Sequence, residues 1–277
     1  MTPSSNQLGR TVQAPNGQEF ARLLQALRLE TPVIALYDCD ASPAFEPIVH
    51  ARGRACCFAY YERWCKGESL LIERSDESFA QPKHGCPGLQ RALGLGGDYP
   101  PWMANFLTDG KNGAPMGEGL KATPQLAQEF LDQATPTQPS GEQLIMGPLR
   151  LEQWDKVRSI TFFADPDRLA ALMTLAAFWS SQPDEIVAPF SSGCGLMWRE
   201  LQNQGRDRAV LGCTDIAMRK YLPPEIMCIT VSPERFARML DYPEDCFLER
   251  SWWRELLDSR AKRNAQTPSA TAQPEKH

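Results

Sequence analysis

The sequence lacks the short motifs that usually identify an enzyme class. It has no Cys-X-X-Cys pair, no G-x-G-x-x-G fingerprint, no Walker loop and no G-x-S-x-G turn. Their absence excludes the ligand runs of ferredoxins, zinc ribbons and thioredoxins, and the signatures of dinucleotide-binding folds, P-loop NTPases and α/β-hydrolases. Function therefore has to be inferred from residues that are scattered along the chain.

Long apolar runs and basic charge are also missing. Because no run of eighteen apolar residues occurs, we expect no transmembrane helix. Residues 1–17 are polar and lack the basic start and apolar stretch of a signal peptide, which predicts a cytoplasmic protein. The formal net charge is -5, whereas broad contact with nucleic-acid phosphates requires a basic surface. We therefore expect a small-molecule substrate or a redox partner, and neither nucleic acid nor a membrane.

Histidine is scarce and cysteine is not. The chain has three histidines, of which His277 is terminal, and nine cysteines. Disulfides rarely persist in a reducing cytosol, so these cysteines are expected to be buried side chains, metal ligands or nucleophiles. Only His50 and His84 could supply imidazole, and any metal site would therefore be rich in thiolates, which favour iron–sulfur clusters, zinc or copper(I). The cysteines are residues 39, 56, 57, 65, 86, 194, 213, 228 and 246.

The apolar pattern predicts a single α/β domain over residues 18–259, with disordered tails at 1–17 and 260–277. Alternating strands and helices indicate helices packed on a mixed sheet, in two loosely similar halves. Residues 55–64 fit either a helix or a strand, and residues 100–119 are predicted to form an ordered loop. The clearest predicted strands are 32–37, 69–73, 159–163, 185–189, 208–211 and 227–231, and the clearest helices are 17–29, 86–95, 123–134, 165–180, 196–204 and 232–240.

Gly-Cys occurs three times at a predicted helix start, at Cys86, Cys194 and Cys213. The first turn of a helix offers unpaired backbone N–H groups and a positive dipole end, which stabilise a thiolate. A preceding glycine permits unusual backbone angles and the close approach of a bulky group. Ligands of open α/β sheets bind where strands end and helices begin, so these three turns could converge on one centre. Each pair taken singly is better explained by a buried cysteine in the core, and only the three together favour a shared centre.

The other cysteines are less informative. Adjacent side chains point in different directions, so at most one of Cys56 and Cys57 is expected to serve a shared site. Cys228 lies in the middle of a predicted strand and is expected to be buried packing, and Cys246 lies in a polar stretch. No residue ties His50 or His84 to a particular thiol, so a Cys–His nucleophile pair is not indicated.

Several segments resemble one family, the uncharacterised domain-of-unknown-function family 169. They include PVIALY, KGESLLIE after Cys57, GCPGLQRALGLG, SITFFADPDRLAALMTLAAFW, LGCTDIAMRKYLPPE and MCITVSPERFARML. The resemblance covers most of residues 30–240. It implies a set of characteristic cysteines, which correspond here to Cys57 (or Cys56), Cys86, Cys194 and Cys213. The sequence departs from the family pattern after Cys213, where Thr-Asp-Ile-Ala replaces a Ser-Gly-Ala type of turn. The resemblance implies no established reaction.

These observations lead to one main hypothesis and two alternatives. The main hypothesis is a four-iron four-sulfur cluster bound by Cys86, Cys194 and Cys213, with Cys57 as a fourth ligand or beside the cluster. With three ligands, one iron would be open to a small molecule, as in lyase or desulfurase-like chemistry; with four, electron transfer would be favoured. The alternatives are a binding or sensor module with a structural zinc on the same cysteines, and a metal-free thiol enzyme or scaffold.

Overall fold

The computed structural model describes residues 13–52, 56–74, 86–96, 98–112, 116–133, 136–190, 193, 195, 198 and 205–266. Side-chain caps start several of the helices. Asn16, Thr123 and Asp165 each accept a backbone N–H of the first turn. The α-helices are α1 (Gly17–Leu27), α2 (Tyr61–Cys65), α3 (Pro87–Ala92), α4 (Met103–Phe106), α5 (Pro124–Asp132), α6 (Pro166–Ala177), α8 (Pro233–Leu240) and α9 (Ser251–Gln266).

Short 3₁₀ helices connect several elements. They are η1 (Pro43–Phe45), η2 (Cys57–Tyr60), η3 (Leu151–Lys156), η4 (Ile216–Tyr221) and η5 (Phe247–Glu249). The strands are β1 (Val33–Tyr37), β2 (Ile48–His50), β3 (Ser69–Glu73), β4 (Gln143–Pro148), β5 (Val157–Ala164), β6 (Ile186–Val187), β7 (Ala209–Gly212) and β8 (Met227–Val231).

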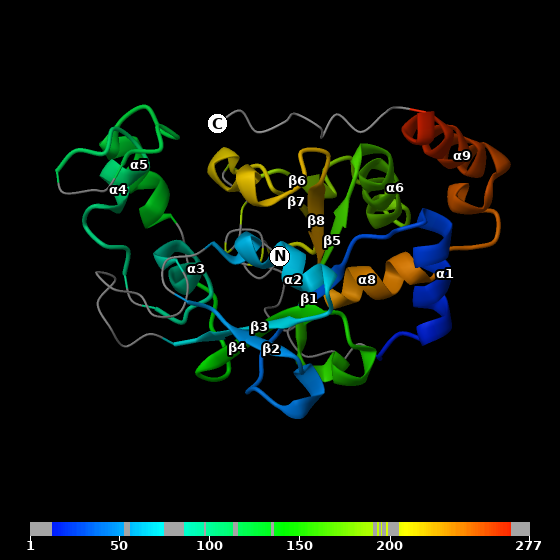
Figure 1. Ribbon diagram of the computed structural model, residues 1–277, viewed down its shortest axis with the longest axis horizontal. Helices are drawn as coiled ribbons and strands as arrows, with labels where there is room; N and C mark the ends of the chain where they lie inside the picture. The colour runs from blue at the N-terminus through cyan, green and yellow to red at the C-terminus, as the bar shows by residue number, and fades with distance from the viewer. Residues whose placement is uncertain are drawn as a thin grey trace, which may run out of the picture.

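The strands form one eight-stranded mixed sheet in the order β2-β3-β4-β1-β5-β8-β7-β6. Helices pack on this sheet, so the predicted α/β fold class is confirmed (Figure 1). Two pairs, β2 with β3 and β6 with β7, are parallel, and every other neighbouring pair is antiparallel. A parallel pair requires a crossover connection, and both crossovers carry residues of the candidate site.

The two halves of the sheet have the same topology. From the central pair β1–β5 outward, one half runs β1-β4-β3-β2 and the other β5-β8-β7-β6, with the same sequence of strand directions. The chain visits the strands of each half in the same order. Thus β1, β2, β3 and β4 correspond to β5, β6, β7 and β8, which gives the loose similarity of the two halves a structural basis.

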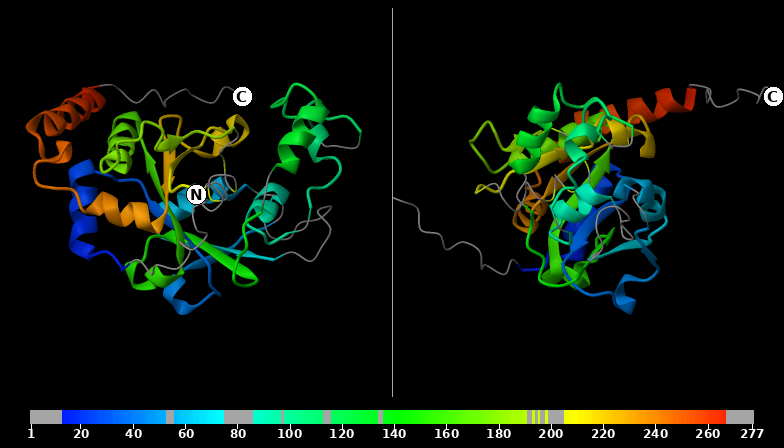
Figure 2. Two further views of the ribbon diagram at one scale, coloured as in Figure 1. Left: turned by 180° about the vertical axis from the view of Figure 1, so that it is seen from behind. Right: turned by 90° about the vertical axis from the view of Figure 1, so that its left-hand side faces the viewer.

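Alternate residues of the strands feed two apolar cores, one on each face of the sheet. On one face, α1, α6 and α8 pack over a core that contains Phe162 and Phe236. On the other face lie η2, α2, α3 and η4, over a core that contains Trp64, Phe163 and Trp198. We call these the helix-face core and the cysteine-face core. The two helical layers lie on opposite sides of the sheet in Figures 1 and 2.

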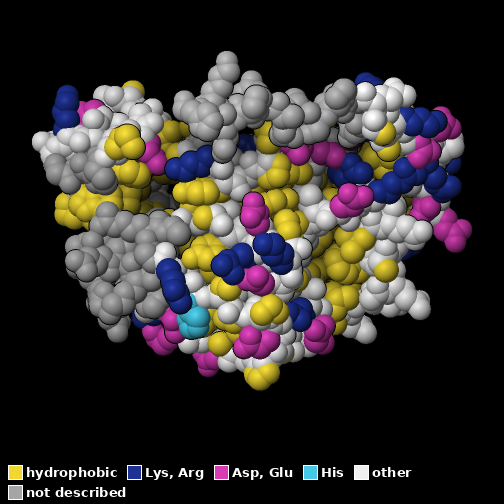
Figure 3. All heavy atoms as spheres, in the orientation of Figure 1, with side chains coloured by type: hydrophobic (Ala, Val, Ile, Leu, Met, Phe, Trp, Pro, Cys, Tyr) yellow, Lys and Arg dark blue, Asp and Glu magenta, His cyan; other side chains and the backbone are white. Residues whose placement is uncertain are grey.

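Helices α4 and α5 form a separate lobe with its own small core, built on Met103, Ala127 and Leu131. The lobe lies at the opposite end of the molecule from α9 (Figure 2). Hydrophobic side chains reach the surface on the lobe, and charges of both signs are interspersed over the rest of the face drawn in Figure 3. No helix in the described part of the chain is long and apolar enough to cross a membrane.

Some predicted boundaries differ from the structure. The helix α9 continues to Gln266, so the predicted domain end at residue 259 falls inside it. The strands β2 and β4 occur where no strand was predicted, and residues 100–119 contain the short helix α4 within an otherwise irregular segment. Residues 55–64 are helical where they are described, as η2 and α2. Most of the predicted tail residues lie outside the described part of the chain.

Candidate metal centre

The four candidate cysteines occupy equivalent connections of the two halves. Cys57 lies between β2 and β3, and Cys194 lies between the corresponding strands β6 and β7. Cys86 lies between β3 and β4, and Cys213 lies between β7 and β8. Each half of the chain therefore contributes one cysteine from its parallel crossover and one from the connection that follows.

Cys86 is the N-cap of α3, as predicted. Its backbone is extended, and its sulfur accepts the backbone N–H of Leu89 over 3.4 Å. Pro87 at the first helical position suits this start, because its missing N–H would have had no helical partner. The helix ends at Ala92, earlier than the predicted residue 95. The half-buried thiol thus already receives one backbone hydrogen bond.

Cys213 is not at a helix start, contrary to the prediction. It follows β7 directly in a left-handed conformation, with φ at 63°, and the cap of η4 is Asp215, whose side chain accepts the N–H of Ala217. Aspartate is a better cap than cysteine, which moves the start of the helical turn down the chain. The left-handed residue turns the chain sharply and places the Cys213 side chain inside the core, where it is buried.

The Cys213 sulfur contacts a second cysteine. It hydrogen bonds to the sulfur of Cys228, 3.0 Å away on β8. The β7–β8 register pairs Gly212 with Cys228 and so brings the next residue, Cys213, alongside. Burial and the neighbouring Cys213 sulfur raise the pKa of the Cys228 thiol well above its ordinary value. Cys228 is therefore buried packing, as predicted, and also the direct neighbour of a candidate ligand.

Cys57 begins η2 and is buried, whereas Cys56 precedes it and is half-buried. Both pack in the cysteine-face core, which also contains Cys86, Cys213 and Cys228. Helical turns η2 and η4 are in contact, so the connections that carry Cys57 and Cys213 meet. Three of the four candidate positions are thus gathered in one core on one face of the sheet.

Cys194 lies outside the described residues, but the glycines on either side of it are described. A Cβ atom added to Gly193 would lie 3.0 Å from the sulfur of Met218 and 3.3 Å from Cβ of Asp215, both on η4 or its cap. A Cβ added to Gly195 would lie 2.4 Å from that of Ala92 on α3. The glycines flanking Cys194 therefore lie against the elements that follow Cys213 and Cys86. A side chain at Gly195 would clash with Ala92, and one at Gly193 would require its neighbours to shift by a few tenths of an ångström.

Within the described residues, no three His, Cys, Asp or Glu side chains are grouped so that they could hold a metal ion. Cys194 and His84 lie outside that part of the chain. His50 is exposed on β2, where its Nδ1 lies 3.3 Å from a Glu73 oxygen. The geometry thus brings the connections of Cys57, Cys86 and Cys213 together in one core.

Two buried tryptophans in the same core have indole N–H groups without acceptors among the described residues. They are Trp64, after Cys57 in the first crossover, and Trp198, after Cys194 in the second. Both are almost fully buried in the cysteine-face core. A buried N–H without a partner costs about 1–3 kcal/mol. An acceptor for either donor would have to come from outside the described residues or from a bound group.

Glu118 lies near Asp215, the cap of η4. Partial desolvation and the negative charge of Asp215 raise the pKa of Glu118, and Lys220 opposes this shift. Burial also raises the pKa of Tyr61, and the nearby thiols of Cys65 and Cys213 add to this shift. Glu118 is therefore a carboxyl group that holds its proton to higher pH than usual, close to the cap of η4.

The remaining cysteines lie elsewhere. Burial raises the pKa of the thiols of Cys39, Cys65 and Cys246. Cys246 is buried in the helix-face core, although its polar sequence neighbourhood suggested a more exposed position. Arg219, which follows Cys213 by two turns, donates to the carbonyls of Ile226 and Pro224 and so braces the turn before β8.

The chain belongs to the family described as uncharacterised ArCR, which is the domain-of-unknown-function family 169. The family model matches residues 22–241. This confirms the resemblance seen in the sequence, and the match includes both halves of the sheet and all four candidate cysteines. Comparisons with curated proteins and with solved structures gave no match.

Proposed function

We propose that the protein binds an iron–sulfur cluster through Cys86, Cys194 and Cys213, with Cys57 as the fourth ligand or beside the cluster. The observation that carries this proposal is the repeated topology: the four cysteines lie in equivalent connections of the two halves, and Cys57, Cys86 and Cys213 lie in one core. Soft thiolates are the ligands that such clusters prefer. The two indole N–H groups in that core that have no acceptor among the described residues also support a bound group with sulfur acceptors.

We further propose an enzyme that acts on a small molecule. A cluster with three cysteine ligands leaves one iron open, which could act as a Lewis acid in a lyase or desulfurase-like reaction. The chain's own contribution would be to exclude water with the apolar cysteine-face core.

Anaerobic reconstitution of the full chain tests the cluster. We expect visible absorbance together with bound iron and acid-labile sulfide, and a loss of most of the iron in Cys86→Ala, Cys194→Ala and Cys213→Ala. Cys39→Ala and Cys65→Ala are matched controls, because these cysteines lie outside the candidate set. A well-folded protein that takes up neither iron nor labile sulfide would rule out the proposal.

A second candidate function is a binding or sensor module with a structural zinc, and the Cys213–Cys228 pair favours it. Four sulfurs at about 2.3 Å from one zinc ion lie about 3.8 Å from each other in a tetrahedron. The observed separation of 3.0 Å needs only a small opening to reach that spacing. Zinc would give a colourless protein, and metal analysis of anaerobically purified protein distinguishes the two functions.

A further inference from the structure

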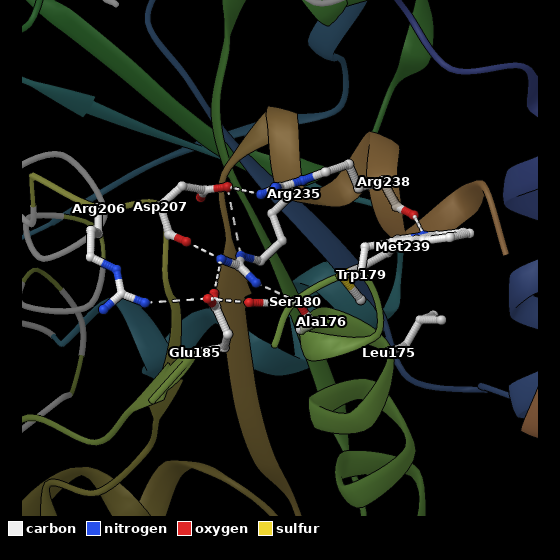
Figure 4. Close-up of a pocket in the computed structure, with 10 residues that line it drawn as sticks. All are labelled: Leu175, Ala176, Trp179, Ser180, Glu185, Arg206, Asp207, Arg235, Arg238 and Met239. Carbon is white, nitrogen blue, oxygen red and sulfur yellow. Dashed lines mark hydrogen bonds and ion pairs between the residues drawn. The ribbon is translucent and has the colours of Figure 1, made fainter. Parts of the chain in front are cut away.

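A cavity of about 240 Å³ lies on the other face of the sheet, among α6, α8 and the residues that precede β6 and β7. Its lining includes residues of the helix-face core, so it is separate from the cysteine-face core. It is smaller than the roughly 300–1,000 Å³ of sites for drug-sized ligands. Figure 4 shows charged side chains from three segments converging on it. The lining residues are Leu175, Ala176, Trp179, Ser180, Glu185, Arg206, Asp207, Arg235, Arg238 and Met239.

Arg235 is the fixed centre of this cavity. Its side chain is 4% exposed, and its guanidinium lies 2.5 Å from the carboxylate of Glu185. It also donates to the carbonyl groups of Ala176 and Asp207, which ties α8 to the end of α6 and to the segment before β7. These partners hold Arg235 in place whatever else binds.

The carboxylates of the cavity already have close partners. Glu185 accepts from the Ser180 hydroxyl over 2.7 Å as well as from Arg235. Asp207 accepts from the Ser232 hydroxyl over 2.6 Å and forms an ion pair with Arg238. These acids are therefore poorly placed to attract a further cation.

Arg206 is held more loosely. Its contacts with Asp184 and Glu185 measure 3.2–3.3 Å, whereas charge-assisted hydrogen bonds are usually about 2.7–2.9 Å long. The three lining arginines exceed the two lining acids by one positive charge. Asp184 and Arg208, beside the cavity, form an ion pair of their own and leave this excess unchanged. The cavity can thus accept one negative charge, and Arg206 is the cation best able to turn toward it.

An apolar wall faces this charge. The wall consists of the cavity-lining side chains of Leu175, Trp179 and Met239, and Trp179 is 56% exposed. The indole N–H of Trp179 donates to the carbonyl of Arg238 over 3.1 Å, which fixes the ring at the cavity. An exposed tryptophan held in one orientation offers a stacking surface at little entropic cost.

We propose that this cavity binds a small monocarboxylate with an apolar group, with the carboxylate on Arg206 and the apolar group against Trp179. A planar guanidinium matches a carboxylate with two parallel hydrogen bonds. One excess positive charge suits a monoanion, and the volume limits the apolar group to about the size of one ring.

Isothermal titration of the full-length, metal-free chain with phenylacetate tests this site, with neutral phenylacetamide as the matched ligand. We expect binding of the acid, at least tenfold weaker binding of the amide, and weaker binding of the acid at higher salt. Arg206→Gln and Trp179→Ala should each weaken phenylacetate binding at least tenfold. Arg254→Gln, an exposed arginine of α9 outside the cavity, should leave it unchanged.

Several outcomes would overturn the proposal, and the first three come from the titrations. They are the absence of phenylacetate binding at millimolar concentration, equal binding of the acid and the amide, and unchanged binding by Arg206→Gln. Inorganic phosphate that competes as strongly as phenylacetate would also overturn it, since that would show a general anion site without use of the apolar wall. Melting curves of the variants without ligand check that each is folded. The outcome does not depend on the iron proposal, because no metal takes part.

Discussion

The contact between Cys213 and Cys228 allows two almost identical truncations to be compared. Both side chains are nearly fully buried in the cysteine-face core, and their sulfurs are 3.0 Å apart. Each change to alanine removes one buried heavy atom, similar to Ile→Val, which costs about 0.5–1.5 kcal/mol. For a chain of this size, 1 kcal/mol corresponds to about 2–4 °C in Tm. In the metal-free protein, we therefore expect both variants to melt a few degrees below the wild type.

The same pair should differ sharply in metal content. If Cys213 is a cluster ligand, Cys213→Ala loses most of the bound iron and the stabilisation that comes with it. Cys228 holds its proton because of its raised pKa, so Cys228→Ala should keep the iron. The assay is iron and labile sulfide per chain after anaerobic reconstitution, together with melting curves with and without metal.

Two results would refute this reasoning. Equal loss of metal in both variants would make Cys228 a ligand as well. That result would favour a zinc site that includes both Cys213 and Cys228. Full iron content in Cys213→Ala would remove Cys213 from the ligand set. A third variant, Cys213→Gly, checks the fold independently. Glycine adopts a φ of 63° without strain, so this variant should be at least as stable as Cys213→Ala without metal, and equally poor in iron.

Further predictions concern other residues of the two cores. Cys57→Ala, with Cys56→Ala as the comparison, should show whether Cys57 is the fourth ligand or lies beside the cluster. Loss of iron would make Cys57 a ligand, and retained iron with lost activity would place it beside an open iron. Trp64→Phe and Trp198→Phe should leave the Tm of the metal-free protein unchanged or raised, because each removes a buried donor that has no acceptor among the described residues. In the cluster-loaded protein, each change should make the reduction potential more negative. An unchanged potential would show that the indole N–H groups do not face the cluster. Glu185→Gln should cost about 3–5 kcal/mol in urea unfolding, because it removes the closest carboxylate partner of the buried Arg235 and leaves only Asp207, 3.7 Å away. Burial alone raises the pKa of Glu185, but hydrogen bonds from Ser180 and Arg235 outweigh burial, and the net pKa is lowered. The stability that comes from ionised Glu185 is present above its ordinary pKa of about 4.5 and is lost as pH falls through the lower pKa of the folded state. The wild type should therefore lose more stability on acidification than Glu185→Gln.

Elements whose signals are local could be predicted from the sequence. The strand β8 and the helix α8 have the predicted limits, because an unbroken apolar run meets a Ser-Pro-Glu cap at Ser232. The strand β3 was also predicted correctly. In these segments, the apolar pattern and the cap residues both indicate the same structure.

Elements that depend on distant partners could not. The strand β4 ends in Gly147-Pro148, which reads locally as a turn, and it is a strand because β1 and β3 pair with it on both sides. The helix α9 has a polar sequence, but Trp253 is buried and Arg260 forms an ion pair with Asp167 on α6. Tertiary contacts therefore stabilise a helix that the apolar pattern alone does not indicate.

The candidate site was only partly predictable for the same reason. Gly-Cys-Pro correctly marks Cys86 as a helix cap. The contact between Cys213 and Cys228 depends on the register of β7 and β8, which a single sequence does not contain. The cavity around Arg235 was also missed, since it joins α6, α8 and two loops. A buried Arg–Glu pair has no local motif, and the acids before β6 and β7 resemble ordinary loop residues.

The repeated topology also bears on the choice between a metal centre and a thiol nucleophile. A nucleophile needs one activated cysteine and a base, and nothing about that chemistry calls for a second copy in the other half. A metal or cluster takes several equivalent thiolates, and two copies of one unit supply them in pairs. Here each crossover contains a cysteine followed by a buried tryptophan, Trp64 or Trp198, with no acceptor among the described residues, and each next connection contains one further cysteine. A single reactive thiol would explain one of these cysteines and neither indole, whereas a centre shared by both halves accounts for the whole arrangement.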